Sequence, residues 1–306
     1  MKVLVLSEHE VEELLTMEEC IGVMEEALAA LARGEVHNPL RQAIRAPGAP
    51  GLLGLMPAWR SGETPYYALK EVCVFPENPK RGLDTHLGAV ILHSGETGEP
   101  LAILNAAAIT AIRTAAVSAV ATRLLARENA SVLTIIGTGA QGKSHRRAIP
   151  VVRPIREIRM CGRADNVEEA VRGADIIVTA TSSREPILRR EWLSPGVHIN
   201  AVGSSIAAAR ELDSETVAAA SLFVDRREST LNESGDFLFA KRDGVIDDSH
   251  IRAELGEILI GTAKGRKSED EITLFKSLGL AVEDLASAAF LYEKARRENR
   301  GTWVEF

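Results

Sequence analysis

A glycine-rich turn is the part of the sequence that most directly indicates chemistry. Gly137-Thr-Gly139-Ala140-Gln141-Gly142 matches G-x-G-x-x-G and lies between an apolar run, 131–136, and a helical pattern, 140–151. The first glycine allows the tight bend, the second lets backbone approach a pyrophosphate, and the third lets the helix pack on the strand. The positive end of the helix favours the anion. Strand, turn and helix together predict a dinucleotide site.

The residues after the next predicted strand, 157–160, bear on which dinucleotide binds. A carboxylate at this strand end holds the ribose 2′-hydroxyl of NAD, whereas an arginine accommodates the 2′-phosphate of NADP. Here Arg163 follows the strand, Glu157 lies at its start, and Asp165 comes after Arg163. The pattern favours NADP, with NAD possible. The alternative interpretation is that Arg163 is a solvated loop arginine.

The elements around these residues predict two domains. From residue 131 strands and helices alternate, which is typical of an α/β protein with a Rossmann-type, doubly wound parallel sheet. Before it, short apolar runs broken by proline and glycine predict several strands, and apolar spacing of three and four predicts helices. These strands are expected at 2–6, 51–56, 66–75, 87–92 and 101–104, and these helices at 17–33 and 106–127, with another at 280–299. The helix over 106–127 is expected to join the domains.

Composition excludes several classes of protein. The chain has 306 residues, 36 Lys plus Arg against 43 Asp plus Glu, and a net charge of -7 without a basic block, which argues against nucleic-acid binding. Neither a signal peptide nor a membrane span is expected, because no apolar run is long enough. The cysteines form no CxxC pair, so no metal site is expected. They are expected to be reduced thiols in a cytoplasmic protein.

Three charged residues stand out against apolar surroundings. Lys70 lies inside the apolar run 66–75, where burial would lower its pKa and suit it to proton transfer. Arg113 lies on an alanine-rich helix, where an unused charge is costly. Asp225 follows the strand 222–224, at the edge of the sheet where ligands bind. Each has an alternative interpretation. Lys70 could be an edge-strand lysine that faces water, Arg113 could form a structural ion pair, and Asp225 could cap a helix.

Taken together, these segments resemble the ornithine cyclodeaminase/mu-crystallin family from residue 1 to about 300. No single motif would suffice, but many occur in the family's order. They are Met56-Pro-Ala, Phe75-Pro-Glu-Asn-Pro, Thr110-Ala-Ile-Arg113, Gly137-Thr-Gly-Ala-Gln141, Ala180-Thr-Ser182, His198-Ile-Asn-Ala-Val-Gly203, Val224-Asp225, Glu254-Leu-Gly-Glu257, Gly261 with Arg266, and Thr273-Leu-Phe-Lys-Ser277-Leu-Gly-Leu-Ala.

The resemblance implies roles for individual residues. Arg41 and Arg113 would hold the carboxylate of a small amino or imino acid, with Arg45 as an alternative to Arg41, and Glu228 would be a second carboxylate that reaches the substrate. Lys70 and Asp225 would carry the acid–base chemistry. The cofactor would be contacted by Thr85, His86, Gly137, Gly139, Ala140, Gln141, Arg163, Thr181, Ser182, Val202 and Ser277.

The resemblance also implies an assembly and an activity. Residues 1–115 with 282–306 would form a mixed-sheet α+β domain for substrate binding and dimerisation, and 116–281 the Rossmann domain of a homodimer. The expected activity is NAD(P)H-dependent reduction of a small cyclic ketimine carboxylate. The alternatives are an ornithine cyclodeaminase that recycles its NAD, a crystallin-like binding protein without turnover, and, more weakly, an alanine dehydrogenase. In that last type an arginine shortly precedes the Met-Pro-Ala motif, where this chain has Gly54.

One departure from the family stands out. Members usually carry a further helix and strand after the second Rossmann strand, which help to enclose the adenosine. Here Arg163-Ala-Asp-Asn leads almost at once into the short helical pattern that begins at Val167. Of all the inferences, the choice of cofactor depends most on this segment.

Overall fold

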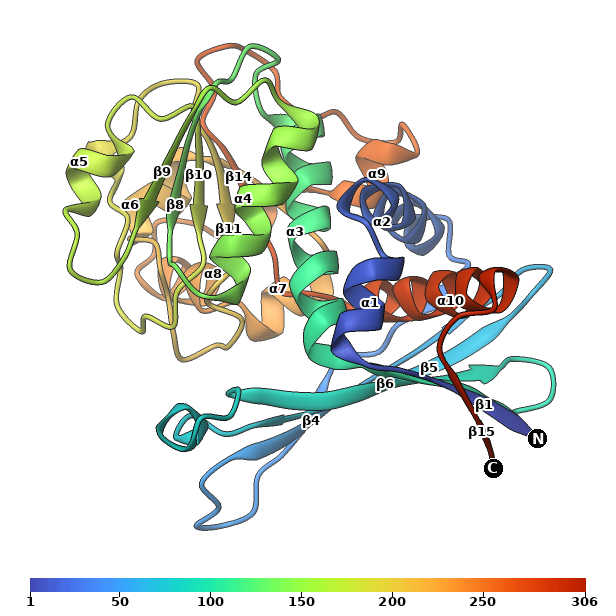
Figure 1. Cartoon of the computed structure of the whole chain (residues 1–306). Coiled ribbons are helices and arrows are strands. Elements are labelled where there is room, and N and C mark those ends of the chain that lie inside the picture. The colour runs from blue at the N-terminus through green and yellow to red at the C-terminus, as the bar shows by residue number, and fades with distance from the viewer. The chain divides into compact units, whose positions relative to one another are not determined.

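The computed structural model describes all 306 residues, which form two compact units (Figure 1). The first unit comprises Met1–Arg113 and Leu280–Phe306, and the second comprises Thr114–Gly279. The boundary falls inside helix α3 (Ala106–Leu125). α3 is the one helix long and apolar enough to cross a membrane, but 72% of its apolar window is buried in the protein, as in a core helix.

The first unit is built on an eight-stranded mixed sheet. Its order is β15-β1-β7-β6-β5-β4-β2, and β3 pairs with β4. Only the β1–β7 pair is parallel. The strands are β1 (Lys2–Leu6), β2 (Val36–His37), β3 (Gln42–Ile44), β4 (Leu52–Arg60), β5 (Tyr66–Val74), β6 (His86–Ser94), β7 (Pro100–Asn105) and β15 (Thr302–Glu305).

Three helices lie on one side of this sheet (Figure 1): α1 (Glu8–Leu14), α2 (Met17–Ala32) and α10 (Ala281–Glu298). A 3-10 turn, Asn78–Arg81, precedes β6. The sequence specifies where α1 and α2 begin, because Ser7 with Glu10 and Thr16 with Glu19 form capping boxes. The C-cap of α10 is Asn299, whose φ of 54° is left-handed.

The central strands of this sheet have two different faces. Met56, Lys70 and Val90 are paired across β4, β5 and β6 and are buried on the helical side. One residue along, Pro57, Leu69 and Ile91 form the equivalent row on the opposite face and are only half-buried. Because side chains alternate along a strand, the second row belongs to an apolar face that no helix of this unit covers.

The second unit is built on a seven-stranded parallel sheet of order β13-β12-β14-β11-β10-β8-β9. The strands are β8 (Val132–Ile136), β9 (Glu157–Cys161), β10 (Ile176–Thr179), β11 (His198–Ala201), β12 (Ser221–Val224), β13 (Ile251–Glu254) and β14 (Thr273–Lys276). The helices are α4 (Ala140–Val152), α5 (Val167–Val171), α6 (Ser214–Ala219), α7 (Arg227–Glu233), α8 (Gly235–Arg242) and α9 (Leu255–Leu259), with 3-10 turns at Arg190–Trp192 and Asp248–His250.

Both faces of the parallel sheet are covered. Leu133 and Ile135 belong to one apolar core, whereas Ile136, with Ile177 and Ile199, belongs to the other. The chain leaves β8 toward β9 and then returns to place β10 on the other side of β8, so the strand order reverses between β8 and β10. Ligands bind at such a switch point. The predicted α/β class, with a Rossmann-type parallel sheet and a mixed sheet, is confirmed.

Candidate active site and dinucleotide site

The glycine-rich turn lies at the switch point, between β8 and α4. Gly137 has a φ of 123°, and a Cβ there would be 2.2 Å from the Ala180 carbonyl oxygen. A Cβ on Gly142 would be 2.0 Å from the Gly137 carbonyl oxygen. A Cβ on Gly139, the N-cap of α4, would meet nothing within 4 Å. The first and third glycines thus allow close packing and the second borders open space, which fits a pyrophosphate at the helix N-terminus.

A buried histidine, which the sequence analysis did not single out, fixes the first turn of α4. His145 Nδ1 lies 2.7 Å from the Gln141 carbonyl oxygen and Nε2 lies 2.8 Å from Ser118 Oγ. A carbonyl only accepts hydrogen bonds, so Nδ1 carries the proton and Ser118 donates to Nε2. Burial lowers the pKa of His145 to about 4, which keeps the ring neutral at pH 7. His145 therefore ties the Gln141 carbonyl, in the first turn of α4, to Ser118 of α3.

Other predicted cofactor residues also follow strands of the parallel sheet. Thr181 and Ser182 come after β10, Val202 after β11, and Ser277 after β14. The Val202 amide donates to the Thr179 carbonyl at 2.9 Å, and the Ser277 amide donates to the Ala201 carbonyl at 3.0 Å. These residues share the carboxyl edge of the sheet with the glycine-rich turn.

The end of β9 carries both an arginine and an acid. Arg163 is exposed, and Asp165 folds back so that its Oδ2 accepts a hydrogen bond of 2.7 Å from the Gly162 amide. The structure thus brings a carboxylate to the strand end, although the sequence places it after Arg163. The two groups favour opposite cofactors, because the carboxylate suits a ribose hydroxyl and the arginine suits a phosphate.

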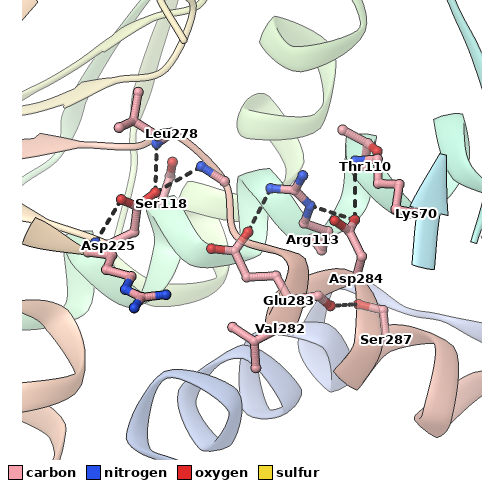
Figure 2. Close-up of polar contacts among 12 residues, drawn as sticks. Lys70, Thr110, Arg113, Ser118, Asp225, Leu278, Val282, Glu283, Asp284 and Ser287 are labelled. Carbon is pink, nitrogen blue, oxygen red and sulfur yellow. Dashed lines mark hydrogen bonds and ion pairs between the residues drawn. The ribbon is translucent and has the colours of Figure 1, made fainter. Parts of the chain in front are cut away.

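Lys70 of the first unit projects from β5 toward α10 and is only 4% exposed. Its Nζ lies 3.3 Å from Asp284 Oδ1 (Figure 2). Burial lowers the pKa of Lys70 to about 8, although Asp284 acts in the opposite direction. Lys70 is thus a buried ammonium that can give up its proton near neutral pH, and it does not face water as an edge lysine would.

Arg113 and Lys70 share Asp284 as a partner. Arg113 Nη1 is 2.6 Å from Glu283 Oε2, and its Nε is 3.1 Å from Asp284 Oδ1 (Figure 2). Glu283 and Asp284 lie in the first turn of α10 and are 0% and 1% exposed. The structural ion pair considered for Arg113 is therefore present. We call Lys70, Arg113, Glu283 and Asp284 the buried charged cluster.

The sequence analysis missed the two acids of this cluster. At the start of an amphipathic helix, Glu283 and Asp284 look like ordinary first-turn acids, which are usually solvated. The signal that could have found them is their position directly after the apolar run 278–282. An apolar run at the start of the helix predicts that the two acids after it are buried, and a buried acid needs a cation as its partner.

Three further predicted residues of the first unit lie elsewhere. Arg41 is half-buried and immediately precedes β3. Thr85 accepts a backbone hydrogen bond of 2.9 Å from Phe75. His86 begins β6, where partial desolvation and then the Lys70 ammonium lower its pKa.

Asp225 and Glu228, the two predicted acids of the second unit, differ in their surroundings. Asp225 is 1% exposed; its Oδ2 accepts from the Leu278 and Gly279 amides at 2.6 and 2.8 Å, and its Oδ1 from the Arg226 amide at 2.8 Å (Figure 2). Three backbone amides therefore donate hydrogen bonds to the Asp225 carboxylate, which acts as an acceptor in all of them. Glu228 is exposed and pairs with Arg226 at 2.5 Å.

The chain belongs to the ornithine cyclodeaminase/mu-crystallin family, whose model matches residues 1–167 and 163–299. It is 39% identical over 326 residues to a Delta(1)-pyrroline-2-carboxylate reductase of Bacillus cereus, covering 99% of this chain and 100% of that one.

Two solved structures have the same fold over nearly their whole length. One is Thermococcus litoralis Delta(1)-pyrroline-2-carboxylate reductase in complex with NADH and L-proline, with a TM-score of 0.93, 40% identity, and coverage of 98% of this chain and 99% of that one. The other is an archaeal alanine dehydrogenase dimer with bound NAD, with a TM-score of 0.93, 36% identity and full coverage of both chains.

Part of the family's sequence has no counterpart in this chain. The alignment with the Bacillus cereus reductase spans 326 positions, so at least 20 of them have no residue among the 306 here. The two matches to the family model meet at 163–167, directly after β9. Only residues 162–166 separate β9 from α5, and β9 is the last strand of its sheet. A Rossmann sheet ordinarily has one more strand beyond this position.

Proposed function

We propose that this protein reduces a small cyclic ketimine carboxylate, such as Δ1-pyrroline-2-carboxylate, to the amino acid with NAD(P)H. The observation that carries the proposal is the buried charged cluster, in which an arginine and a lysine of lowered pKa meet at one carboxylate. The first cation suits a substrate carboxylate and the second suits an imine nitrogen. The likeness to a reductase solved with NADH and L-proline supports the same substrate class.

The reaction needs a hydride on carbon and a proton on nitrogen. The nicotinamide, when bound, supplies the hydride. Arg113, together with Arg41, orients the imine by its carboxylate, and Lys70 gives its proton to the nitrogen as the C=N bond becomes a C–N single bond. Lys70 is favoured over Asp225 as the acid, because an ammonium is a donor and the Asp225 oxygens already accept three backbone hydrogen bonds.

A substrate panel tests this function. Cyclic ketimine carboxylates, ornithine and alanine are each incubated with each nicotinamide cofactor, and cofactor oxidation and amino-acid products are measured. We expect ketimine-dependent oxidation of the reduced cofactor. Consumption of ornithine with ammonia release and no net oxidation would establish a cyclodeaminase instead. Binding without turnover of any substrate would establish a crystallin-like binding protein.

We expect NADPH to bind more tightly than NADH, because Arg163 at the end of β9 can pair with a 2′-phosphate. Arg163→Ala should lower the NADPH preference by about tenfold, the typical weight of one charge-assisted hydrogen bond. Fluorescence titration with each cofactor measures this ratio. Arg156→Ala, before the opposite end of β9, is the matched control and should leave it unchanged. Tighter binding of NADH in the wild type would show that Asp165 decides the specificity.

We expect the protein to form a homodimer through the uncovered apolar face of the first unit. Leu69 lies at its centre, between Pro57 and Ile91, and Tyr67 on the same face is 51% exposed. Such a patch marks an interaction surface, and the alanine dehydrogenase of the same fold is a dimer.

Light scattering at micromolar concentration should give twice the mass of one chain. Leu69→Lys should shift the equilibrium toward the monomer, because it places a charge in the apolar face. Val151→Lys changes an apolar residue of α4 that is 38% exposed and should leave the dimer intact. A monomeric wild type would contradict the prediction.

A further inference from the structure

A fully buried glutamate of the second unit joins two of the loops at the carboxyl edge of the parallel sheet. Glu211 Oε1 accepts hydrogen bonds from the Thr181 amide and hydroxyl, both at 2.7 Å. Its Oε2 accepts from the Thr179 hydroxyl and the Gly203 amide, both at 2.8 Å. Thr181 follows β10 and Gly203 follows β11, so one carboxylate fixes the spacing of both loops.

The contacts suit an ionised Glu211. Two of its four partners are backbone amides, which can only donate, and the Thr179 and Thr181 hydroxyls donate to it as well. The side chain is 0% exposed, and burial raises its pKa, although the Lys276 ammonium opposes that shift. The four hydrogen bonds replace the water that would otherwise solvate this carboxyl group.

A second ion pair holds the loop that carries Glu211. Asp236 Oδ1 accepts hydrogen bonds from the amides of Glu211 and Leu212 at 2.8 and 3.0 Å. Its Oδ2 lies 2.8 Å from the Nζ of Lys276, the last residue of β14. Asp236 and Lys276 are 2% and 1% exposed. The position of the glutamate is therefore set by α8 and β14 and not by its own loop alone.

The arrangement leads directly to the glycine-rich turn. A Cβ on Gly203 would lie 2.2 Å from the Thr181 carbonyl oxygen and 2.5 Å from Glu211 Oε1. The residue before Thr181 is Ala180, and its carbonyl oxygen would lie 2.2 Å from a Cβ on Gly137. Movement of the Thr181 loop would therefore move the wall against which the glycine-rich turn packs.

We propose that Glu211 is a positioning residue for dinucleotide binding, which holds the loops after β10 and β11 in the arrangement that accepts the cofactor. This inference rests on the proposed function, because it presumes that a nicotinamide dinucleotide binds at this edge. Glu211 is 0% exposed beneath the loops, so it acts through Thr181 and Gly203.

Glu211→Gln tests the proposal. The amide replaces one acceptor oxygen by an NH2 group, which in either orientation faces a backbone amide donor, that of Thr181 or that of Gly203. We expect the Kd for NADH and NADPH, measured by fluorescence titration, to rise about tenfold or more, since hydrogen bonds to a charged group are lost. With saturating cofactor, kcat and the KM for the imine should stay close to the wild-type values.

Asp175→Asn is the matched control. The Asp175 carboxylate accepts two backbone hydrogen bonds, from Ser131 and Val132 at 2.8 and 3.0 Å, directly before β10 and so at the opposite edge of the sheet. Its loss should lower the melting temperature but leave the cofactor Kd unchanged. Thr179→Val, which removes a single donor to Glu211, is a milder variant for the case that Glu211→Gln does not fold, and it should raise the Kd severalfold.

The outcomes separate this proposal from the proposed function. A wild type that binds NADH, together with Glu211→Gln and Thr179→Val variants that bind it equally well, would overturn the positioning role and leave the function standing. A lowered melting temperature with unchanged Kd would likewise show a purely structural glutamate. A wild type that binds neither NADH nor NADPH would overturn both.

Discussion

Replacing Lys70 by methionine should lower kcat/KM for the cyclic imine about 10²–10⁴-fold, the usual contribution of a general acid. Methionine keeps a similar length but cannot donate the proton that the nitrogen needs. Cofactor affinity should stay the same, because Lys70 lies on β5 of the first unit, whereas the glycine-rich turn belongs to the second. Steady-state kinetics together with a cofactor titration separate the two effects.

The pH dependence of the wild type should carry the same signature. If the ammonium of Lys70 is the acid, activity should fall as the pH rises through about 8, the lowered pKa of this side chain. Stability should change in the opposite direction. Between about 8 and the ordinary 10.5 the unfolded chain binds the proton and the folded chain does not, so the free energy of unfolding contributed by Lys70 rises over this range. The Lys70→Met variant should lack both effects.

Asp225→Asn distinguishes the two candidate acids. If this variant lost turnover while Lys70→Met retained it within a few-fold, Asp225 would be the proton donor and the assignment to Lys70 would be wrong. If Asp225 is the anchor that its contacts with the Leu278 and Gly279 amides suggest, Asp225→Asn should mainly lower the melting temperature.

Arg113→Ala should have the largest effect on stability. It leaves Glu283 and Asp284 buried with Lys70 as their only remaining cation in the cluster, and breaking a buried ion pair typically costs about 3–5 kcal/mol. Substrate binding should also weaken, because the guanidinium is the proposed partner of the substrate carboxylate. Denaturant unfolding gives the free energy of unfolding, and the KM for the imine gives the second effect.

Arg33→Ala is the control for that measurement. Arg33 pairs with Glu26 and Glu35, but its side chain is 37% exposed, so its removal should change stability little. An Arg113→Ala protein as stable as the wild type would contradict the buried ion pair. An Arg113→Ala protein that is less stable but has an unchanged KM for the imine would show that Arg113 has a structural role only.

The sequence predicts those parts of the fold whose signals are local. The glycine-rich turn, its strand and its helix are consecutive, and the helices that begin at Met17 and Ala106 follow apolar periodicity. In contrast, the sequence indicates β14 only through a family motif. Its four buried residues, Thr273–Lys276, include Lys276, and a buried strand that ends in lysine looks partly exposed until Asp236 is placed beside it.

The site is less predictable because its partners are distant in sequence. Lys70 and Arg113 stand out, since a charge in an apolar run needs a purpose, but Asp284 is 214 residues from Lys70. Asp165 shows the same limit on a smaller scale: only the turn that brings its carboxylate to the Gly162 amide places it at the strand end. Glu211 lies in an irregular loop, and no spacing in the sequence links it to Thr181.

Transfer of a labelled hydride tests the central claim most directly. The protein is incubated with Δ1-pyrroline-2-carboxylate and reduced nicotinamide cofactor in which both hydrogens at C4 are deuterium, and the product is analysed by mass spectrometry. We predict proline with one deuterium on the carbon that bears the carboxylate, formed in step with cofactor oxidation and strongly reduced in Lys70→Met. Absence of proline, or proline without deuterium at that carbon, would contradict the assignment of this protein as a ketimine reductase.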